Sequence, residues 1–323
     1  MSATTNTAAA SPTQQTGQAN LEVFSQTLIE LGRQDPSITV VTSDSRGSAK
    51  LGPFAEALPR QIVEVGIAEQ NLVGIAAGLA STGKKVFAIS PACFLTARAL
   101  EQIKNDVCYS DNPVKVVGIS AGVSYGALGS THHSLHDLAA LRAIDNIDIV
   151  VPADNFETRS AIRAAANQQH PIYLRFGKRP MAHLYGADTT FQIGKALTVR
   201  NGTDVAFIAN GETVHPALAA AELLEAQGVS SRVLSMHTIK QLDDQALIDA
   251  ATHCRAIITV EEHSVHGGLG EACAAVLMQK GIACPFRITG IPDEYTITGS
   301  QQEIFDHYGL SAQGLAQTAQ DLL

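Results

Sequence analysis

The 323-residue sequence has no tryptophan, few charged residues and no long apolar stretch. Charged side chains make up only 16% of the chain, and the 31 acids outnumber the 22 bases. No basic block stands out, which disfavours nucleic-acid binding. No apolar run approaches the roughly 20 residues of a membrane-spanning helix. The low charge content is typical of a chain that buries surface against another chain.

Cysteine is also sparse, and its pattern gives no sign of metal or disulfide chemistry. The five cysteines are scattered, odd in number and form no C-x-x-C pair. This pattern argues against a disulfide framework or a zinc ribbon and favours a reducing cytoplasm. Residues 1–19 are small and polar, without the charged start and apolar core of a secretion signal, so we predict a flexible tail there.

Apolar strand-like runs alternate with helical stretches along the rest of the chain. The expected strands are residues 38–43, 61–65, 85–90, 114–120, 147–152, 171–176, 204–210, 231–236, 256–261 and 284–289. The expected helices are residues 20–33, 69–81, 95–109, 135–142, 155–168, 213–227, 243–253, 268–280 and 310–322. Short apolar strands separated by helices predict an α/β fold, with mostly parallel sheets that carry helices on both faces.

Glycines and a proline interrupt this rhythm between residues 177 and 194. We therefore predict a first domain at 20–182, a linker at 183–200 and a smaller second domain at 201–323. In open parallel sheets, ligands bind at the carboxyl ends of the strands, so the loops that follow the strands are the candidate sites.

The most informative loop runs from Glu64 to Asn71, where a strand ends, Gly66 turns the chain and a helix begins near Glu69. An acid in the first turn of a helix is favoured by the helix dipole. The residues alone therefore leave two interpretations of Glu69, a helix-stabilising acid or a carboxyl group in a cleft that exchanges a hydrogen bond with a ligand.

The segment VGIAEQN at residues 65–71 resembles the GIAEQ motif of the thiamine-dependent transketolase superfamily. Further segments resemble that family in the same order, at residues 94–103, 129–133, 137–139, 151–154, 171–175, 238–240, 261–263 and 267–270. The resemblance covers about residues 20–323. It implies a thiamine-diphosphate-binding fold, with a pyrimidine-binding domain followed by a transketolase C-terminal domain.

The resemblance assigns roles around the cofactor thiamine diphosphate. The carboxyl group at the position of Glu69 shares a proton with N1′ of the aminopyrimidine, which lets the cofactor's own amino group act as a base. This role needs a protonated acid, which burial favours and the helix dipole opposes. Phe94, otherwise an ordinary core residue, is implied to stack on the pyrimidine. Gly66, Ile67 and Arg98 are implied to line the same site.

Three histidines lie within five residues, at His132, His133 and His136. A zinc site is disfavoured because no fourth ligand and no HExxH spacing accompany them. The resemblance makes His132 the active-site histidine, close to the reactive end of the cofactor and to a substrate oxygen, where imidazole suits proton transfer near neutral pH. His133 stands where the family usually has glutamine, and its role stays open.

The sequence contains no Gly-Asp pair. In the family, a GDG segment and a later asparagine supply the ligands of Mg²⁺ and the cofactor diphosphate. We therefore expect no metal ligands in this chain and a partner, an N-terminal transketolase subunit, that carries them. The implied assembly is an α₂β₂ heterotetramer that binds thiamine diphosphate between its chains and is active only as a complex.

The implied reaction moves a two-carbon ketol unit from a ketose, phosphorylated or not, to an aldose. Leu128 stands where full-length transketolases carry an aspartate that contacts a substrate hydroxyl, and Lys178 replaces a phosphate-binding arginine. We expect Ser45, Arg175 and Lys178, together with His132, to contact substrate. These departures leave an unusual sugar, such as a branched one, open.

Three other kinds of protein share parts of this pattern. A 2-oxoacid dehydrogenase β subunit has a similar length and domain order, but the turn at 131–133 and the segment 101–103 favour transketolase. Deoxyxylulose phosphate synthase carries its own diphosphate domain. A non-catalytic regulatory subunit is disfavoured because Glu69, Phe94 and His132 are all retained. Glu262 and His263, which precede a glycine-rich turn, are expected at a contact between subunits.

Overall fold

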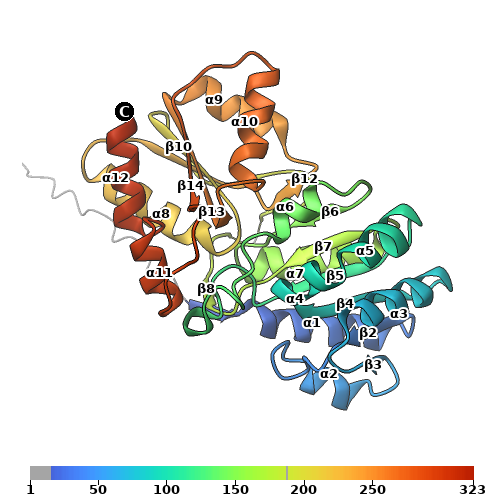
Figure 1. Ribbon diagram of the computed structural model, residues 1–323. Helices are drawn as coiled ribbons and strands as arrows, with labels where there is room; N and C mark the ends of the chain where they lie inside the picture. The colour runs from blue at the N-terminus through green and yellow to red at the C-terminus, as the bar shows by residue number, and fades with distance from the viewer. Residues whose placement is uncertain (1–15, 187) are drawn as a thin grey trace, which may run out of the picture.

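The structure is a computed structural model that describes residues 16–186 and 188–323 (Figure 1). Residues 1–15 of the predicted tail lie outside the described residues. The last four residues assigned to that tail form strand β1 (Thr16–Ala19), which pairs antiparallel with β8 (Pro180–Ala182). Among the described residues, no helix has both the length and the apolar character needed to cross a bilayer.

The first domain is built on a seven-stranded sheet with the order β12-β6-β7-β5-β4-β2-β3. Its strands are β2 (Ile38–Thr42), β3 (Ile62–Glu64), β4 (Lys85–Pro91), β5 (Lys115–Ile119), β6 (Asp148–Val150), β7 (Ile172–Arg175) and β12 (Thr238–Lys240). The six strands predicted for this domain are confirmed and run parallel. The seventh, β12, comes from the second half of the chain and joins the edge antiparallel. It was not predicted.

Helices cover both faces of this sheet, as the two-sided apolar strands predict. They are α1 (Asn20–Gln34), α2 (Gly52–Ala57), α3 (Glu69–Ser81), α4 (Ala92–Arg98), α5 (Leu100–Gln102), the π-helix η1 (Ile103–Tyr109), the 3₁₀ turn η2 (Gly126–Leu128), α6 (Asp137–Arg142) and α7 (Asn155–Asn167). Val40 packs in the core under α1, α2 and α7, whereas its neighbour Val41 packs in the core under α3, α4 and α6. The helix expected at 95–109 is broken into α4, α5 and η1.

The second domain has a five-stranded sheet with the order β14-β13-β10-β11-β9. Its strands are β9 (Leu197–Arg200), β10 (Val205–Ala209), β11 (Ser231–Ser235), β13 (Ala256–Ser264) and β14 (Phe286–Ile291). Its helices are η3 (Gly211–Thr213), α8 (Val214–Glu225), α9 (Asp244–His253), α10 (Leu269–Gln279), α11 (Gln301–His307) and α12 (Ala312–Leu322). All pairs are parallel except that of β9, so the predicted fold class is confirmed in both domains.

The two domains meet through buried polar side chains as well as apolar ones. Glu262 and His263, on β13, are 3% and 0% exposed and face the first domain within the same chain. The expectation that they lie at a contact between subunits was therefore wrong. The sequence places them correctly at a strand end, but which surface covers that end depends on how the domains pack.

Candidate active site

Glu69 is the first residue of α3, as the sequence predicts. The chain reaches it from β3 through Gly66, whose φ of 73° is a left-handed conformation that glycine adopts without strain. The Glu69 side chain is only 5% exposed, and its Oε1 lies 2.9 Å from Nη1 of Arg98. Next to it, Ile67 is 74% exposed. A buried carboxyl group and an exposed apolar side chain therefore lie two positions apart in the chain.

Helix α4 presents Phe94 and Arg98 on the same side, one turn apart. The Arg98 guanidinium carbon lies 4.4 Å from the centre of the Phe94 ring, which is cation–π geometry. Arg98 thus contacts both the buried carboxyl group of Glu69 and the aromatic ring. Its own side chain is half exposed, so the pair opens to the surface.

His132 is held between two aromatic rings. Its ring lies edge-on to Phe94, with centroids 5.3 Å apart, and edge-on to Tyr125 at 5.5 Å. Thr131 Oγ1 lies 3.0 Å from His132 Nδ1. The Lys178 ammonium also contacts Tyr125, 4.5 Å from the centre of its ring. One continuous row of contacts therefore joins six side chains: Glu69, Arg98, Phe94, His132, Tyr125 and Lys178.

Five of these six side chains are ones that the sequence singles out, and Tyr125 is the one that sequence reasoning missed. The available signal was its place in the loop after β5, at the carboxyl end of a parallel strand, where ligands are expected. A tyrosine in such a loop can belong to a structural turn or to a binding site, so its position alone assigns it no role.

Two other predicted site residues have their polar groups engaged elsewhere. Arg175 is 4% exposed, and its Nε donates to Asp137 Oδ2 at 2.8 Å. Its Nη2 donates to the carbonyl oxygens of Ser134 and Glu262, each at 3.0 Å. Ser45 is 5% exposed and donates to the Ser43 carbonyl oxygen at 2.8 Å. Arg175 therefore joins the two domains, and Ser45 closes a turn.

The pKa values of the ionisable groups around Arg175 are shifted from their ordinary values. Burial alone would raise the pKa of the Asp137 carboxyl, but the cationic Arg175 and the nearby His263 lower it below its usual value. Burial lowers the pKa of His263 to about 4, so that imidazole is neutral at pH 7. Burial, reinforced by Glu212, raises the pKa of Glu262 to about 8. At pH 7 these pKa shifts keep the Asp137–Arg175 pair charged and His263 neutral, and they favour the neutral form of Glu262.

The three clustered histidines diverge in the structure. His132 lies in the row of contacts, His133 is 3% exposed, and His136 is exposed. Within the part of the chain that the structure describes, no three His, Cys, Asp or Glu side chains are grouped in a way that could hold a metal ion.

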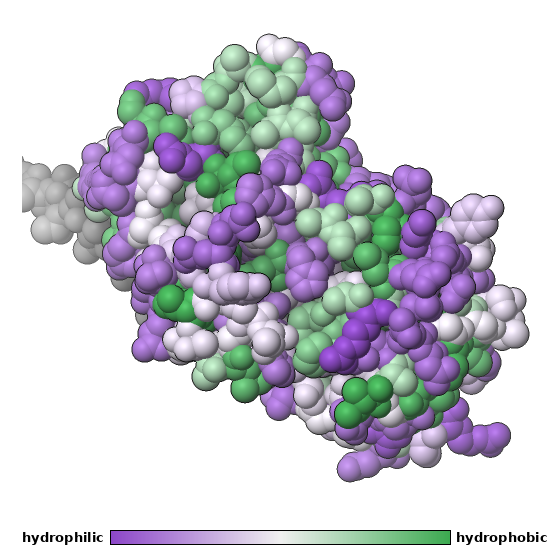
Figure 2. Space-filling view, in the orientation of Figure 1, coloured by the Kyte–Doolittle hydropathy of each residue, from purple (hydrophilic) through white to green (hydrophobic). Residues whose placement is uncertain are grey.

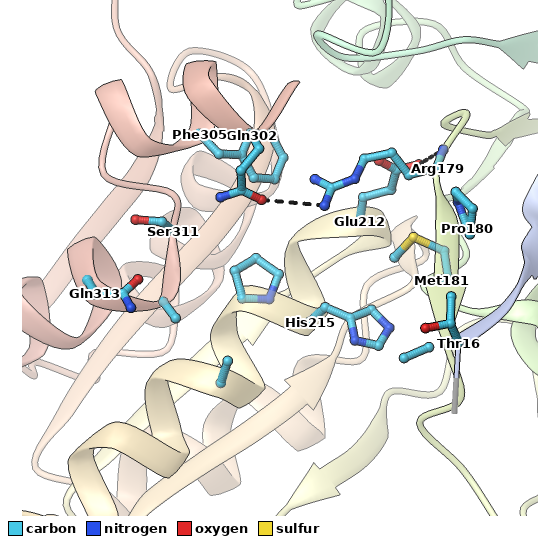
Figure 3. A pocket seen from close by; sticks show the side chains of 14 residues that line it. Thr16, Arg179, Pro180, Met181, Glu212, His215, Gln302, Phe305, Ser311 and Gln313 are labelled. Carbon is cyan, nitrogen blue, oxygen red and sulfur yellow. Dashed lines mark hydrogen bonds between the residues drawn. The ribbon is translucent and has the colours of Figure 1, made fainter. Parts of the chain in front are cut away.

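A cavity of about 370 Å³ lies apart from this row, between β8 and the helices α8, α11 and α12 (Figure 3). Arg179 extends into it and donates from Nη2 to Gln302 Oε1 at 3.4 Å, while its backbone N–H donates to Glu212 Oε1 at 3.3 Å. Arg175, Lys178 and Arg179 form one basic cluster in the sequence. In the structure, Arg175 lies in the buried ion pair with Asp137, Lys178 in the row of contacts and Arg179 at this cavity.

Large apolar side chains are exposed at several places on the described surface. Apolar side chains reach the surface at the end of the first domain that carries β3 and α2 (Figure 2). Besides Ile67, the large exposed apolar residues include Leu128 at 54%, Tyr109 at 90% and Tyr295 at 90%. Single exposed apolar residues are common on protein surfaces, and only a contiguous patch indicates an interface.

Two domain matches decide the family. Residues 17–182 match the transketolase pyrimidine-binding domain, and residues 194–315 match the transketolase C-terminal domain. The chain belongs to the transketolase family. The membership in this family that the GIAEQ-like segment and the other matching segments predict is therefore confirmed.

Similar transketolase chains include several of comparable length. An apulose-4-phosphate transketolase subunit of Phocaeicola vulgatus is 50% identical over 92% of this chain and 95% of its own. A 6-deoxy-6-sulfo-D-fructose transketolase subunit of a Clostridium species is 32% identical over 93% of each chain. Among solved structures, a split-gene transketolase, described as an inactive beta4 tetramer, has a TM-score of 0.85 and 36% identity, over 95% of this chain and 98% of its own.

Proposed function

We propose that this chain is the C-terminal subunit of a two-chain transketolase, which transfers a two-carbon ketol unit from a ketose phosphate to an aldose acceptor. The observation that carries the proposal is the row of contacts, because Glu69 at the start of α3, Phe94 in α4 and His132 in the loop after β5 meet at one site. The 50% identity to an apulose-4-phosphate transketolase subunit supports a branched ketose phosphate of that type as donor.

The residues present fit the aminopyrimidine half of thiamine diphosphate. Glu69 offers a buried carboxyl group, Phe94 an aromatic face and Ile67 an exposed apolar side chain, while Gly66 leaves the approach open. When bound, the cofactor supplies the nucleophilic carbon that cleaves the ketose carbon–carbon bond. In this role Glu69 shares a proton with N1′ of the pyrimidine, against the positive charge of Arg98, which orients both Glu69 and Phe94.

His132 and Lys178 serve the substrate end of the site. The Thr131 hydroxyl lies at His132 Nδ1, so we assign Nε2 to the proton exchanged with a substrate oxygen. The exposed Lys178 ammonium can hold a phosphate as a point charge, although not with the two parallel bonds that arginine makes. Leu128 adds an exposed apolar side chain to the loop that carries His132, which suits a donor whose substituents differ from those of a common ketose.

The other half of the cofactor site belongs, in this proposal, to an N-terminal partner subunit. The sequence has no Gly-Asp pair to bind Mg²⁺ and the diphosphate. Exposed Ile67 and the low charge content fit a surface that a partner covers, in an α₂β₂ assembly. The solved split-gene relative is an inactive tetramer of β chains, which supports the need for a second kind of subunit. The five cysteines, all free thiols, fit a cytoplasmic enzyme.

The test is a coupled assay of this chain co-expressed with its N-terminal partner, in the presence of thiamine diphosphate and Mg²⁺. We expect ketol transfer from apulose 4-phosphate to an aldose phosphate with the complex and none with this chain alone. Glu69→Gln should lower kcat by roughly 10²- to 10⁴-fold without loss of the fold. Turnover by the isolated chain, or oxidation of a 2-oxoacid with a lipoyl domain by the complex, would contradict the proposal.

A further inference from the structure

The loop that carries His132 is closed on itself and packed against the second domain. Gly122 and Ser134 exchange two backbone hydrogen bonds, of 3.2 and 2.8 Å, which bring the ends of the loop together. Between them, a Cβ added at Gly126 would lie 2.4 Å from the carbonyl oxygen of Gly299, so the loop backbone lies directly against the segment before α11. At the start of the loop, Val123 N–H donates to Glu262 Oε1 at 2.9 Å.

His133 ties the middle of this loop to the second domain. Its Nε2 lies 3.0 Å from the carbonyl oxygen of Gly126, and its Nδ1 lies 2.6 Å from the hydroxyl oxygen of Thr296. A carbonyl oxygen only accepts, so Nε2 carries a proton. Burial lowers the pKa of His133, which favours the neutral ring. Nδ1 is then an acceptor, and the Thr296 hydroxyl donates to it.

Thr296 completes the link on the side of the second domain. Because its hydrogen is directed to His133, its oxygen accepts from the hydroxyl of Ser130, 3.0 Å away. Two residues of the loop are thereby bound to one threonine that is 8% exposed. Each polar atom in this chain of bonds has a defined role as donor or acceptor, so removal of one side chain leaves a buried neighbour without its partner.

We propose that His133 is a positioning residue for the transketolase reaction, which together with Thr296 of the second domain holds His132 between Phe94 and Tyr125. This inference rests on the proposed function, because it assumes that His132 meets the substrate. It also gives the second domain a role in the site, since that domain supplies the threonine. The backbone of His132 is held together with that of His133, because the two residues are adjacent in the chain. The backbone N–H groups of both also donate to the Gly129 carbonyl oxygen.

The chemistry of the link specifies which substitutions preserve it. A glutamine at 133 presents an amide N–H in place of Nε2–H and an amide oxygen in place of Nδ1, with the same donor and acceptor roles. Alanine presents neither. At position 296, serine keeps the hydroxyl, whereas valine keeps the shape and loses it. The matched pairs are therefore His133→Gln against His133→Ala, and Thr296→Ser against Thr296→Val.

Two measurements on these four variants test the inference. Steady-state kinetics of the assembled complex should show kcat lowered roughly 10- to 100-fold in His133→Ala and Thr296→Val, with a smaller change in KM. His133→Gln and Thr296→Ser should stay within about threefold of wild type. In the same complexes, hydrogen–deuterium exchange at residues 126–134 should be faster in the first two variants and unchanged in the others, and this readout needs no turnover.

The outcomes separate this inference from the proposed function. A wild-type complex without ketol transfer contradicts the proposed function, while the exchange measurement still tests the link. Wild-type activity that His133→Ala and Thr296→Val both retain, or exchange that neither changes, overturns the inference. So does a His133→Gln complex as impaired as His133→Ala. If His133→Ala fails to fold, Thr296→Val decides, because it removes one hydroxyl and keeps the side-chain volume.

Discussion

Glu69 and Arg98 form an ion pair of 2.9 Å between one nearly buried and one half-exposed side chain. The same guanidinium lies 4.4 Å from the centre of the Phe94 ring. The helices α3 and α4 therefore orient each other's functional side chains. Arg98 links the group proposed to exchange a proton with the cofactor to the ring proposed to stack on it.

Arg98→Met should weaken cofactor binding and leave stability almost unchanged. An ion pair with a half-exposed arginine contributes at most about 1 kcal/mol to the free energy of unfolding. Loss of the group that orients Glu69 and Phe94 should raise the apparent Kd for thiamine diphosphate about tenfold, or about 1.4 kcal/mol. Fluorescence titration of the apo-complex measures this Kd.

Arg163→Met is the matched control, because Arg163 is 45% exposed and pairs with Glu30 at 2.6 Å away from the row of contacts. It should leave cofactor affinity at the wild-type value. Equal affinity in the Arg98→Met and Arg163→Met complexes would remove Arg98 from the site.

Arg175→Met should lower the free energy of unfolding and leave phosphate binding unchanged. Its partner Asp137 is 0% exposed in its side chain, so the substitution leaves a buried carboxylate unpaired. Breaking such a pair costs roughly 3–5 kcal/mol. Urea denaturation measures the loss, again with Arg163→Met as the exposed control. A loss below about 1 kcal/mol, with a raised KM for the sugar phosphate, would return Arg175 to the substrate site.

Much of the fold and part of the site could be predicted from the sequence. Helix α3 begins at Glu69 as expected, because a strand, a glycine turn and an amphipathic run leave little freedom there. The link between His133 and Thr296 could not be predicted, since it joins residues 163 positions apart across two domains. Periodicity reports which face of an element is apolar, but not which element covers it. For the same reason β12, which crosses to the other domain's sheet, was missed.

The domain interface should make stability depend on pH through Glu262. Burial, together with Glu212, raises the pKa of Glu262 to about 8 in the folded protein, above its ordinary value of 4.5. The folded state then binds a proton that the unfolded state has released. The contribution is complete below about pH 4.5 and is lost as the pH rises through about 8.

Between pH 7 and 8, the free energy of unfolding should therefore fall by up to about 1.4 kcal/mol per pH unit from this group. His263 adds little slope there, because its folded pKa of about 4 and its ordinary value of 6.5 both lie below this range. Glu262→Gln keeps the shape and should reduce the slope to the part that comes from Glu261, whose pKa burial raises to about 7, as measured by urea denaturation at each pH. An unchanged slope in the variant would assign the titration to another group.

The most direct measurement of the central claim is an experimental structure of this chain in complex with its N-terminal partner, thiamine diphosphate and Mg²⁺. We expect the Glu69 carboxyl group within hydrogen-bond distance of N1′ of the pyrimidine, about 2.6–3.2 Å, with the Mg²⁺ ligands on the partner chain. A Glu69 side chain that faces solvent, or a cofactor held entirely by one chain, would contradict it.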